Sequence, residues 1–265
     1  MEYGSTHDQT AATVTADGSE DRKSPATGHG DAHREGAGIS PKDVARRIFG
    51  SNPTGVPCLQ GGQPTGISDR KDHSQAERQA VGEADFLPRL KFLSTIDARG
   101  TEHAVRFRGG VVEKHQHCSG WIPVVTPQGK IGVDQACPSE YLHRLDLQNE
   151  LFGDDIEVIG ITRGDRFAIT QPTLKGGEPS ENEIRDVLEA GGWRRIPIGL
   201  QDLPPALMGS AWWHEDEQLI LLDARKPNFK KTDFGTLPID LILADLTPEM
   251  RQLLNVSSAI DRNAG

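Results

Sequence analysis

The hydrophobic and polar positions divide the chain at about residue 86. Residues 1–85 contain only Tyr3 and Phe49 as aromatic residues, among many Gly, Ser, Thr, Asp, His and Gln residues. A segment of this composition cannot bury enough apolar surface to offset the entropy lost on ordering it. We therefore predict a mostly disordered arm over residues 1–85 and a folded domain over residues 86–265.

One short helix is predicted inside the arm, over residues 41–49. Ser40 is a typical N-cap, Pro41 suits the first helical position, and Gly50 can end the helix. Because a helix of this length is rarely stable alone, we expect it to fray unless it docks on the folded domain or on a partner.

Between residues 86 and 265, alternation of apolar and polar residues predicts short strands that are separated by turns. Strands joined by such short turns pair as antiparallel hairpins. The predicted pairs are residues 104–107 with 110–114, residues 156–161 with 166–170, and residues 212–214 with 218–222.

Two helices are predicted in the same region. Residues 138–152 have apolar side chains at helical spacing and are followed by Gly153. A capping box at Ser180–Glu183 opens the second helix, which Gly191 and Gly192 end. Strands and helices in this order predict an α+β fold with a small antiparallel sheet.

Charge and composition limit the partners. The net charge is −10, and no run of Lys or Arg is longer than a pair, so we do not expect direct nucleic-acid binding. No apolar run has membrane-spanning length, and the N-terminus lacks a signal-peptide pattern, so no membrane partner is expected. The three cysteines form no disulfide framework. A cytoplasmic location is the resulting prediction.

Three polar residues near the C-terminal end suggest chemistry. Asp223 follows an apolar run, Asn228 comes five positions later, and Asp240 follows a hairpin-like stretch. Phosphoryl transfer uses one carboxylate to orient the attacking hydroxyl, and an amide oxygen and a second carboxylate to hold magnesium. The spacing therefore suggests a kinase-like site.

Several other segments share this resemblance, from about residue 95 to residue 250. Together they are similar to the serine/threonine/tyrosine-kinase-like domain of bacterial polyvalent proteins, which belong to phages and conjugative elements. The segments are 102–105, Lys114, 140–145, 149–154, 170–172, 223–228 and 238–240. The resemblance implies a reduced, bilobal, protein-kinase-like fold and a transferase that uses ATP and Mg²⁺ to phosphorylate a hydroxyl, with a protein as the expected acceptor.

The resemblance also implies roles for the acidic loop. Asp223 would be the catalytic base, and Arg225 would face the transferred phosphate. Asn228 and Asp240 would be the metal ligands. Asp233-Phe234-Gly235 spells the usual kinase metal motif, but it follows Asn228 too closely, so we interpret it as a turn.

Nucleotide-binding roles follow for residues nearer the N-terminus. Lys114 would contact the α- and β-phosphates, with Glu140 or Glu150 as its partner. We prefer Glu140. Gln171 would lie at the hinge beside the adenine, and residues 100–103 occupy the position of the phosphate-covering loop.

The chain also departs from the kinase pattern. No His-Arg precedes Asp223, and no Ala-Pro-Glu follows Asp240. A nucleotide-binding pseudokinase and a non-catalytic interaction module of a mobile genetic element therefore remain as alternatives.

Overall fold

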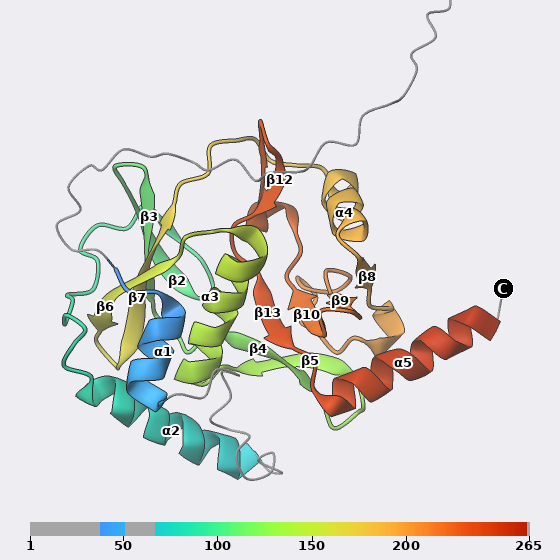
Figure 1. The fold of residues 1–265 in the computed structure, drawn as a ribbon, viewed down its shortest axis with the longest axis horizontal. Helices are drawn as coiled ribbons and strands as arrows, with labels where there is room; N and C mark the ends of the chain where they lie inside the picture. Colours follow the sequence, from blue (N-terminus) through green and yellow to red (C-terminus); the bar gives the residue numbers. More distant parts are fainter. Residues whose placement is uncertain (1–37, 51–66, 264–265) are drawn as a thin grey trace, which may run out of the picture. The chain divides into compact units, whose positions relative to one another are not determined.

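Two antiparallel sheets organise residues 38–50 and 67–263, the part of the chain that the computed structural model describes (Figure 1). The larger sheet has five strands in the order β1-β2-β3-β7-β6. Its strands are β1 (Ala98–Arg99), β2 (His103–Arg108), β3 (Val111–Gln116), β6 (Glu157–Thr162) and β7 (Arg166–Pro172). The predicted hairpins β2–β3 and β6–β7 are both confirmed.

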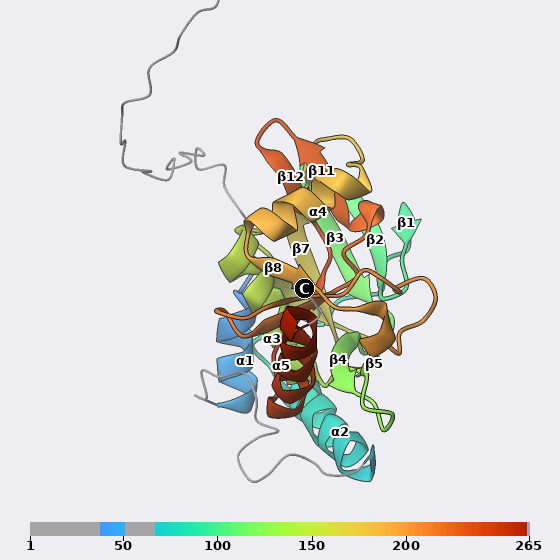
Figure 2. The ribbon, with the colours of Figure 1, turned by 90° about the vertical axis from the view of Figure 1, so that its right-hand side faces the viewer.

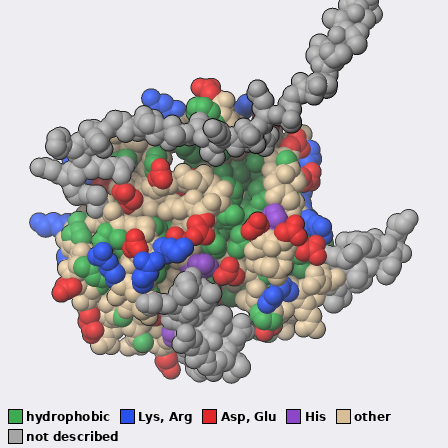
Figure 3. Space-filling view, in the orientation of Figure 1, with side chains coloured by type: hydrophobic (Ala, Val, Ile, Leu, Met, Phe, Trp, Pro, Cys, Tyr) green, Lys and Arg blue, Asp and Glu red, His purple; other side chains and the backbone are tan. Residues whose placement is uncertain are grey.

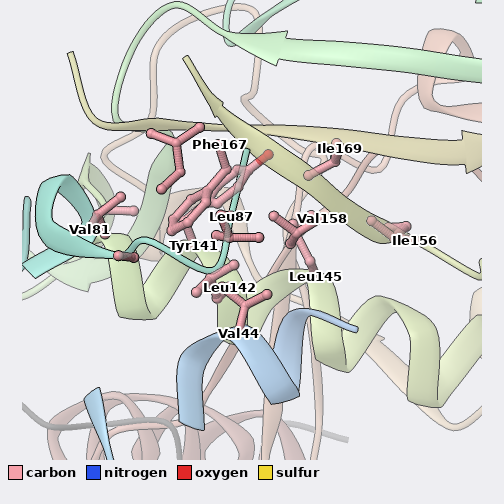
Figure 4. Close-up of a cluster of buried hydrophobic side chains, with 13 residues drawn as sticks. Val44, Val81, Leu87, Tyr141, Leu142, Leu145, Ile156, Val158, Phe167 and Ile169 are labelled. Carbon is pink, nitrogen blue, oxygen red and sulfur yellow. The ribbon is translucent and has the colours of Figure 1, made fainter. Parts of the chain in front are cut away.

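Helix α3 (Pro138–Phe152) packs on this sheet and has the bounds predicted from the sequence. Pro138 occupies its first turn, the Glu140 carboxylate accepts a hydrogen bond from the Cys137 backbone N–H at 2.7 Å, and the chain leaves the helix at Gly153 in a left-handed conformation. A hydrophobic core therefore forms between helix and sheet, with Tyr141 stacked on Phe167 (Figure 4).

The second sheet has four strands in the order β13-β10-β9-β8. These strands are β8 (Trp193–Arg195), β9 (Trp212–His214), β10 (Leu219–Leu222) and β13 (Ile242–Asp245). The β9–β10 hairpin confirms the third predicted pair. Strand β10 is buried throughout, because it lies between two other strands and contributes side chains to hydrophobic clusters on both faces.

Two further hairpins and the remaining helices complete the described part. The hairpins are β4 (Trp121–Val125) with β5 (Ile131–Gln135), and β11 (Phe229–Thr232) with β12 (Gly235–Pro238). Helix α4 (Glu181–Ala190) confirms the predicted capping box, and α5 (Pro248–Asn263) ends the described chain. Helix α4 lies beside the β11–β12 hairpin, where Lys231 pairs with Glu183 (Figure 2).

Hydrophobic side chains also gather on the face shown in Figure 3, between α3 and the β11–β12 hairpin. A buried hydrophobic cluster joins Leu147 of α3 to Ile184 of α4 and Leu221 of β10. The described residues thus form an α+β fold with several small antiparallel sheets and five helices. No helix within the described ranges is long and apolar enough to cross a membrane.

The predicted boundary at residue 86 needs correction, because side chains of two helices before it are buried in the core of the folded domain. The helix expected at 41–49 is present as α1 (Pro41–Phe49), and it docks through Val44, which is fully buried against α3 (Figure 4). A second helix, α2 (Ile67–Glu83), occupies sequence that we had assigned to the arm. The rest of that arm, residues 1–37 and 51–66, lies outside the described residues.

Helix α2 docks mainly through polar contacts, which explains why its apolar pattern is weak. The buried Glu77 carboxylate accepts hydrogen bonds from the backbone N–H and the hydroxyl of Ser139, at 2.9 and 2.7 Å. Ser139 lies in the first turn of α3, where unpaired N–H groups and the helix dipole favour an anion. Val81 adds a fully buried apolar contact.

Candidate functional site

Lys114 and Asp240 come together as the sequence predicted. Lys114 lies on β3 and is only 8% exposed. Its Nζ lies 3.9 Å from Oδ2 of Asp240 and donates a hydrogen bond to the Ile239 carbonyl at 3.2 Å. Asp240 follows strand β12, and 40% of its side chain is exposed. A cation and a partly accessible carboxylate therefore share one site.

Asn228 and Asp223 are linked to this site through the backbone. The Asn228 side-chain amide donates a hydrogen bond to the Asp223 carbonyl at 2.9 Å, and the Ile239 N–H donates to the Asn228 carbonyl at 2.8 Å. The β11–β12 hairpin lies between Asn228 and Asp240, as expected. Because the amide nitrogen of Asn228 is used internally, its oxygen is the atom left to bind a cation.

Arg225 forms an ion pair with Asp223, two residues before it. Asp223 itself has a φ of 66°, a left-handed conformation that is uncommon for residues other than glycine. Its side chain is 19% exposed and that of Arg225 is 39% exposed. Arg225 therefore holds the carboxylate of the predicted base, and a role toward the phosphate would require it to leave this pair.

Gln171 lies on the same face of the large sheet as Lys114. Strand register pairs Lys114 with Ile169 and Val112 with Gln171, so Lys114 and Gln171 are diagonal neighbours across β3 and β7. The Gln171 side chain is buried and donates to Oδ2 of Asp154 at 3.1 Å. The predicted hinge residue is thus part of a polar contact inside the fold.

The predicted pairing of Lys114 with Glu140 is not present. Both Glu140 oxygens accept hydrogen bonds from Arg70 of α2, each at 3.0 Å, and one also caps α3. The alternative, Glu150, accepts a hydrogen bond from Lys42 of α1 at 2.9 Å. Both partners come from the N-terminal segment: helix α2, which was not predicted, and helix α1, which was predicted without its contacts.

Two buried pairs near Lys114 were not predicted. Arg144 of α3 donates to both oxygens of Glu102, at 2.9 and 2.6 Å, and Nε2 of His103 lies 2.8 Å from the Tyr141 hydroxyl. Tyr141, Arg144 and Gln148 share one face of α3 because they are three and four residues apart. Polar residues on that otherwise buried face were the signal available in the sequence.

Potential metal-ligating atoms of Glu102, His103 and Asp240 lie within 4.8 Å of one another. Both Glu102 oxygens are, however, already held by Arg144, and one also accepts from the Trp121 N–H at 3.0 Å. Asp240 is therefore the carboxylate of this group with an oxygen most open to a cation.

We use the name lysine cluster for His103, Lys114, Asp154, Gln171 and Asp240. Burial lowers the pKa of His103 to about 4, and burial raises the pKa of Asp154 to about 6. Burial opposes ionisation of Asp240 as well, but the positive charges of Lys114 and Arg144 hold its pKa below the usual range. At neutral pH the cluster thus contains a neutral imidazole and ionised Asp240.

The literal Asp-Phe-Gly sequence lies at the tip of the β11–β12 hairpin, and the ring of Phe234 is 93% exposed. Each strand of this hairpin has four residues, so the tip is roughly 13 Å from its base beside Asn228 and Asp240. The structure agrees with our interpretation of Asp233-Phe234-Gly235 as a turn.

No protein-family model, curated protein or solved structure matches this chain. The kinase resemblance therefore stays a prediction, and any function has to be argued from the site itself.

Proposed function

We propose that this protein is an ATP- and magnesium-dependent phosphotransferase of protein-kinase-like type, which transfers phosphate to a hydroxyl group, with a protein as the expected acceptor. The observation that carries the proposal is the approach of Lys114 to Asp240, with Asn228 one backbone hydrogen bond away. Lys114 lies far from Asn228 and Asp240 in the sequence, so its approach to them is a property of the fold.

The donor set fits the proposed ligands. Carboxylate and amide oxygens are preferred by Mg²⁺, and Asp240 and Asn228 offer one of each. The ammonium group of Lys114 would bind the nucleotide phosphates. Magnesium, when bound, would neutralise the phosphate charge. Lys114 also lies on the third strand of its sheet, as the nucleotide-binding lysine of protein kinases does, although here the β4–β5 hairpin precedes α3.

Asp223 is the proposed base. Its carboxylate would accept the proton of the attacking hydroxyl while the hydroxyl oxygen bonds to the γ-phosphorus of ATP. The bond between the γ-phosphorus and the β–γ bridging oxygen breaks, and ADP leaves. The hydrogen bond from Asn228 to the Asp223 carbonyl would keep the base and the metal ligand in a constant relative position. Arg225, once released from Asp223, would bind a phosphate oxygen.

The test is a thermal-shift titration of the whole chain with ATP and Mg²⁺, together with transfer of labelled γ-phosphate to itself and to casein. We expect a magnesium-dependent rise in melting temperature that Asp240→Asn abolishes. Asp233→Asn, which removes an exposed charge at the hairpin tip, is the matched control and should behave as wild type. Absence of any shift in the wild type would refute the proposal.

A second candidate, a nucleotide-binding pseudokinase, is favoured by one observation. Neither Glu140 nor Glu150 pairs with Lys114, whereas active protein kinases need a lysine–glutamate pair. Asp223→Asn separates the two functions. For a kinase, this variant should still bind nucleotide but lose phosphate transfer, whereas a pseudokinase shows no transfer even in the wild type.

A further inference from the structure

Asp154 is a buried carboxylate without an ion-pair partner among the described residues. It lies just after α3, and its Oδ2 accepts hydrogen bonds from two amides, Gln148 of α3 and Gln171 of β7. Amides satisfy the oxygen but supply no positive charge. Burying an ionised carboxylate in this way is costly, so a nearby cation is expected to compensate it.

Lys114 is linked to Asp154 through Gln171. Gln171, which binds Asp154, is a diagonal neighbour of Lys114 on the sheet face that packs against α3. The positive charge of Lys114 favours the ionised form of Asp154, while Asp240 and Asp155 oppose it. Asp154 and Asp240 therefore both attract the ammonium group electrostatically, and in this structure its ion pair is with Asp240.

The contacts that Lys114 makes with Asp240 and Ile239 are weak enough for other contacts to replace them. The distance from Lys114 Nζ to Asp240 is 3.9 Å, near the upper limit for an ion pair, and the remaining hydrogen bond goes to a neutral carbonyl. If Asp240 gives its oxygen to a metal ion, Lys114 loses much of this attraction. A lysine on its flexible four-carbon chain would then be drawn toward Asp154.

We propose that Asp154 is a positioning residue for Lys114, the carboxylate that holds the ammonium group toward the nucleotide phosphates while Asp240 binds metal. This inference rests on the proposed function, since it assigns the lysine partner that neither Glu140 nor Glu150 supplies. Asp154 acts through Lys114 and does not itself touch the nucleotide.

The first test compares Asp154→Asn with wild type in titrations with Mg²⁺ and ATP. The asparagine oxygen can still accept from both glutamine amides, so a purely structural role would leave nucleotide binding unchanged. We expect the melting temperature at pH 7.5 to be equal or higher, because a buried charge is removed, and the dissociation constant for the magnesium–ATP complex to rise about tenfold or more. Unchanged affinity would overturn the proposal.

Asp155→Asn is the matched control, because it removes the same charge from the neighbouring, exposed position, and asparagine tolerates the positive φ found there. It should leave affinity unchanged. If Asp154→Asn does not fold, Asp154→Ser, which is neutral and smaller, takes its place in the same titration.

A second readout does not depend on nucleotide binding. Acetylation of Lys114 by acetic anhydride, followed by peptide mass spectrometry, measures how readily its amine reacts, and an ion pair with a carboxylate slows this reaction. Loss of the Asp154 charge should increase this rate relative to wild type, and Asp155→Asn should not. Equal rates would overturn the pairing. A higher rate in a protein that binds no nucleotide would support the pairing of Asp154 with Lys114 while refuting the kinase function.

Discussion

Arg144 donates hydrogen bonds to both oxygens of Glu102, and both residues are almost completely buried, at 2% and 8% exposure. The pair connects α3 to the start of β2. It also stands beside the lysine cluster, because Glu102 is followed directly by His103. A buried ion pair of this geometry is strongly destabilising to break, since one charge is left without its partner.

We predict that Glu102→Gln lowers the free energy of unfolding by about 3 kcal/mol or more, because Arg144 keeps its charge in a buried site. Urea denaturation followed by circular dichroism measures this loss. Arg185→Ala is the control, since Arg185 and Asp186 form an exposed ion pair that should contribute less than about 1 kcal/mol. Equal effects of the two substitutions would contradict the prediction.

A chain of residues 86–265 should be less stable than one of residues 36–265. The shorter chain lacks Val44 and Val81, two fully buried side chains that each contribute about 1.5–3 kcal/mol to the free energy of unfolding. It also lacks Glu77 of α2, whose carboxylate accepts a hydrogen bond from Ser139 at the start of α3. We expect a melting temperature at least about 8 °C lower by scanning calorimetry. Equal melting temperatures would restore residue 86 as the domain boundary.

His103 should make the fold sensitive to mild acid. Burial lowers the pKa of His103 to about 4 from an ordinary value of 6.5, so the unfolded chain binds a proton here before the folded chain does. Its contribution to stability is therefore complete above pH 6.5 and is lost as the pH falls toward 4. In His103→Gln, urea denaturation between pH 7 and pH 4.5 should show a smaller loss. An unchanged pH dependence would show that folding does not lower the pKa of His103.

Asn228 should affect both stability and nucleotide binding. Asn228→Ala removes the hydrogen bond to the Asp223 carbonyl, at a cost of about 1 kcal/mol, together with the proposed metal-ligating oxygen. Asn228→Asp removes the donor but keeps an oxygen. By titration calorimetry with magnesium–ATP, affinity should fall in the order wild type, Asn228→Asp, Asn228→Ala. If the two variants bind equally, the side-chain oxygen is not a ligand.

Local signals in the sequence were sufficient for the elements whose ends are marked by short-range chemistry. The helical spacing and terminal Gly153 of α3, the capping box of α4 and the alternation in β2 and β3 depend on residues a few positions apart. Helix α2 was missed because its docking uses Glu77 and Arg70, whose partners lie more than sixty positions away. Polar docking leaves no apolar stripe from which to predict a helix.

The residues of the candidate site also differ in whether short-range or long-range contacts determine their position. Asp223, Asn228 and Asp240 lie close in sequence, and their spacing was enough to select them. Asp154 and Gln171 depend on the register between β3 and β7 and on the end of α3, neither of which the sequence specifies directly. That Glu140 pairs with Arg70 and not with Lys114 could therefore not be predicted from the sequence.

The β11–β12 hairpin fixes the distance between Asn228 and Asp240 in space. Asn228 and Asp240 flank its base, and the pairing of Phe229 with Pro238 closes it there, while Asp233 and Phe234 project at the far end. Residues added at the tip would lengthen the hairpin without changing the distance between Asn228 and Asp240 at its base. The exposed tip is thus a suitable attachment point for a fluorophore that leaves the paired base of the hairpin unchanged.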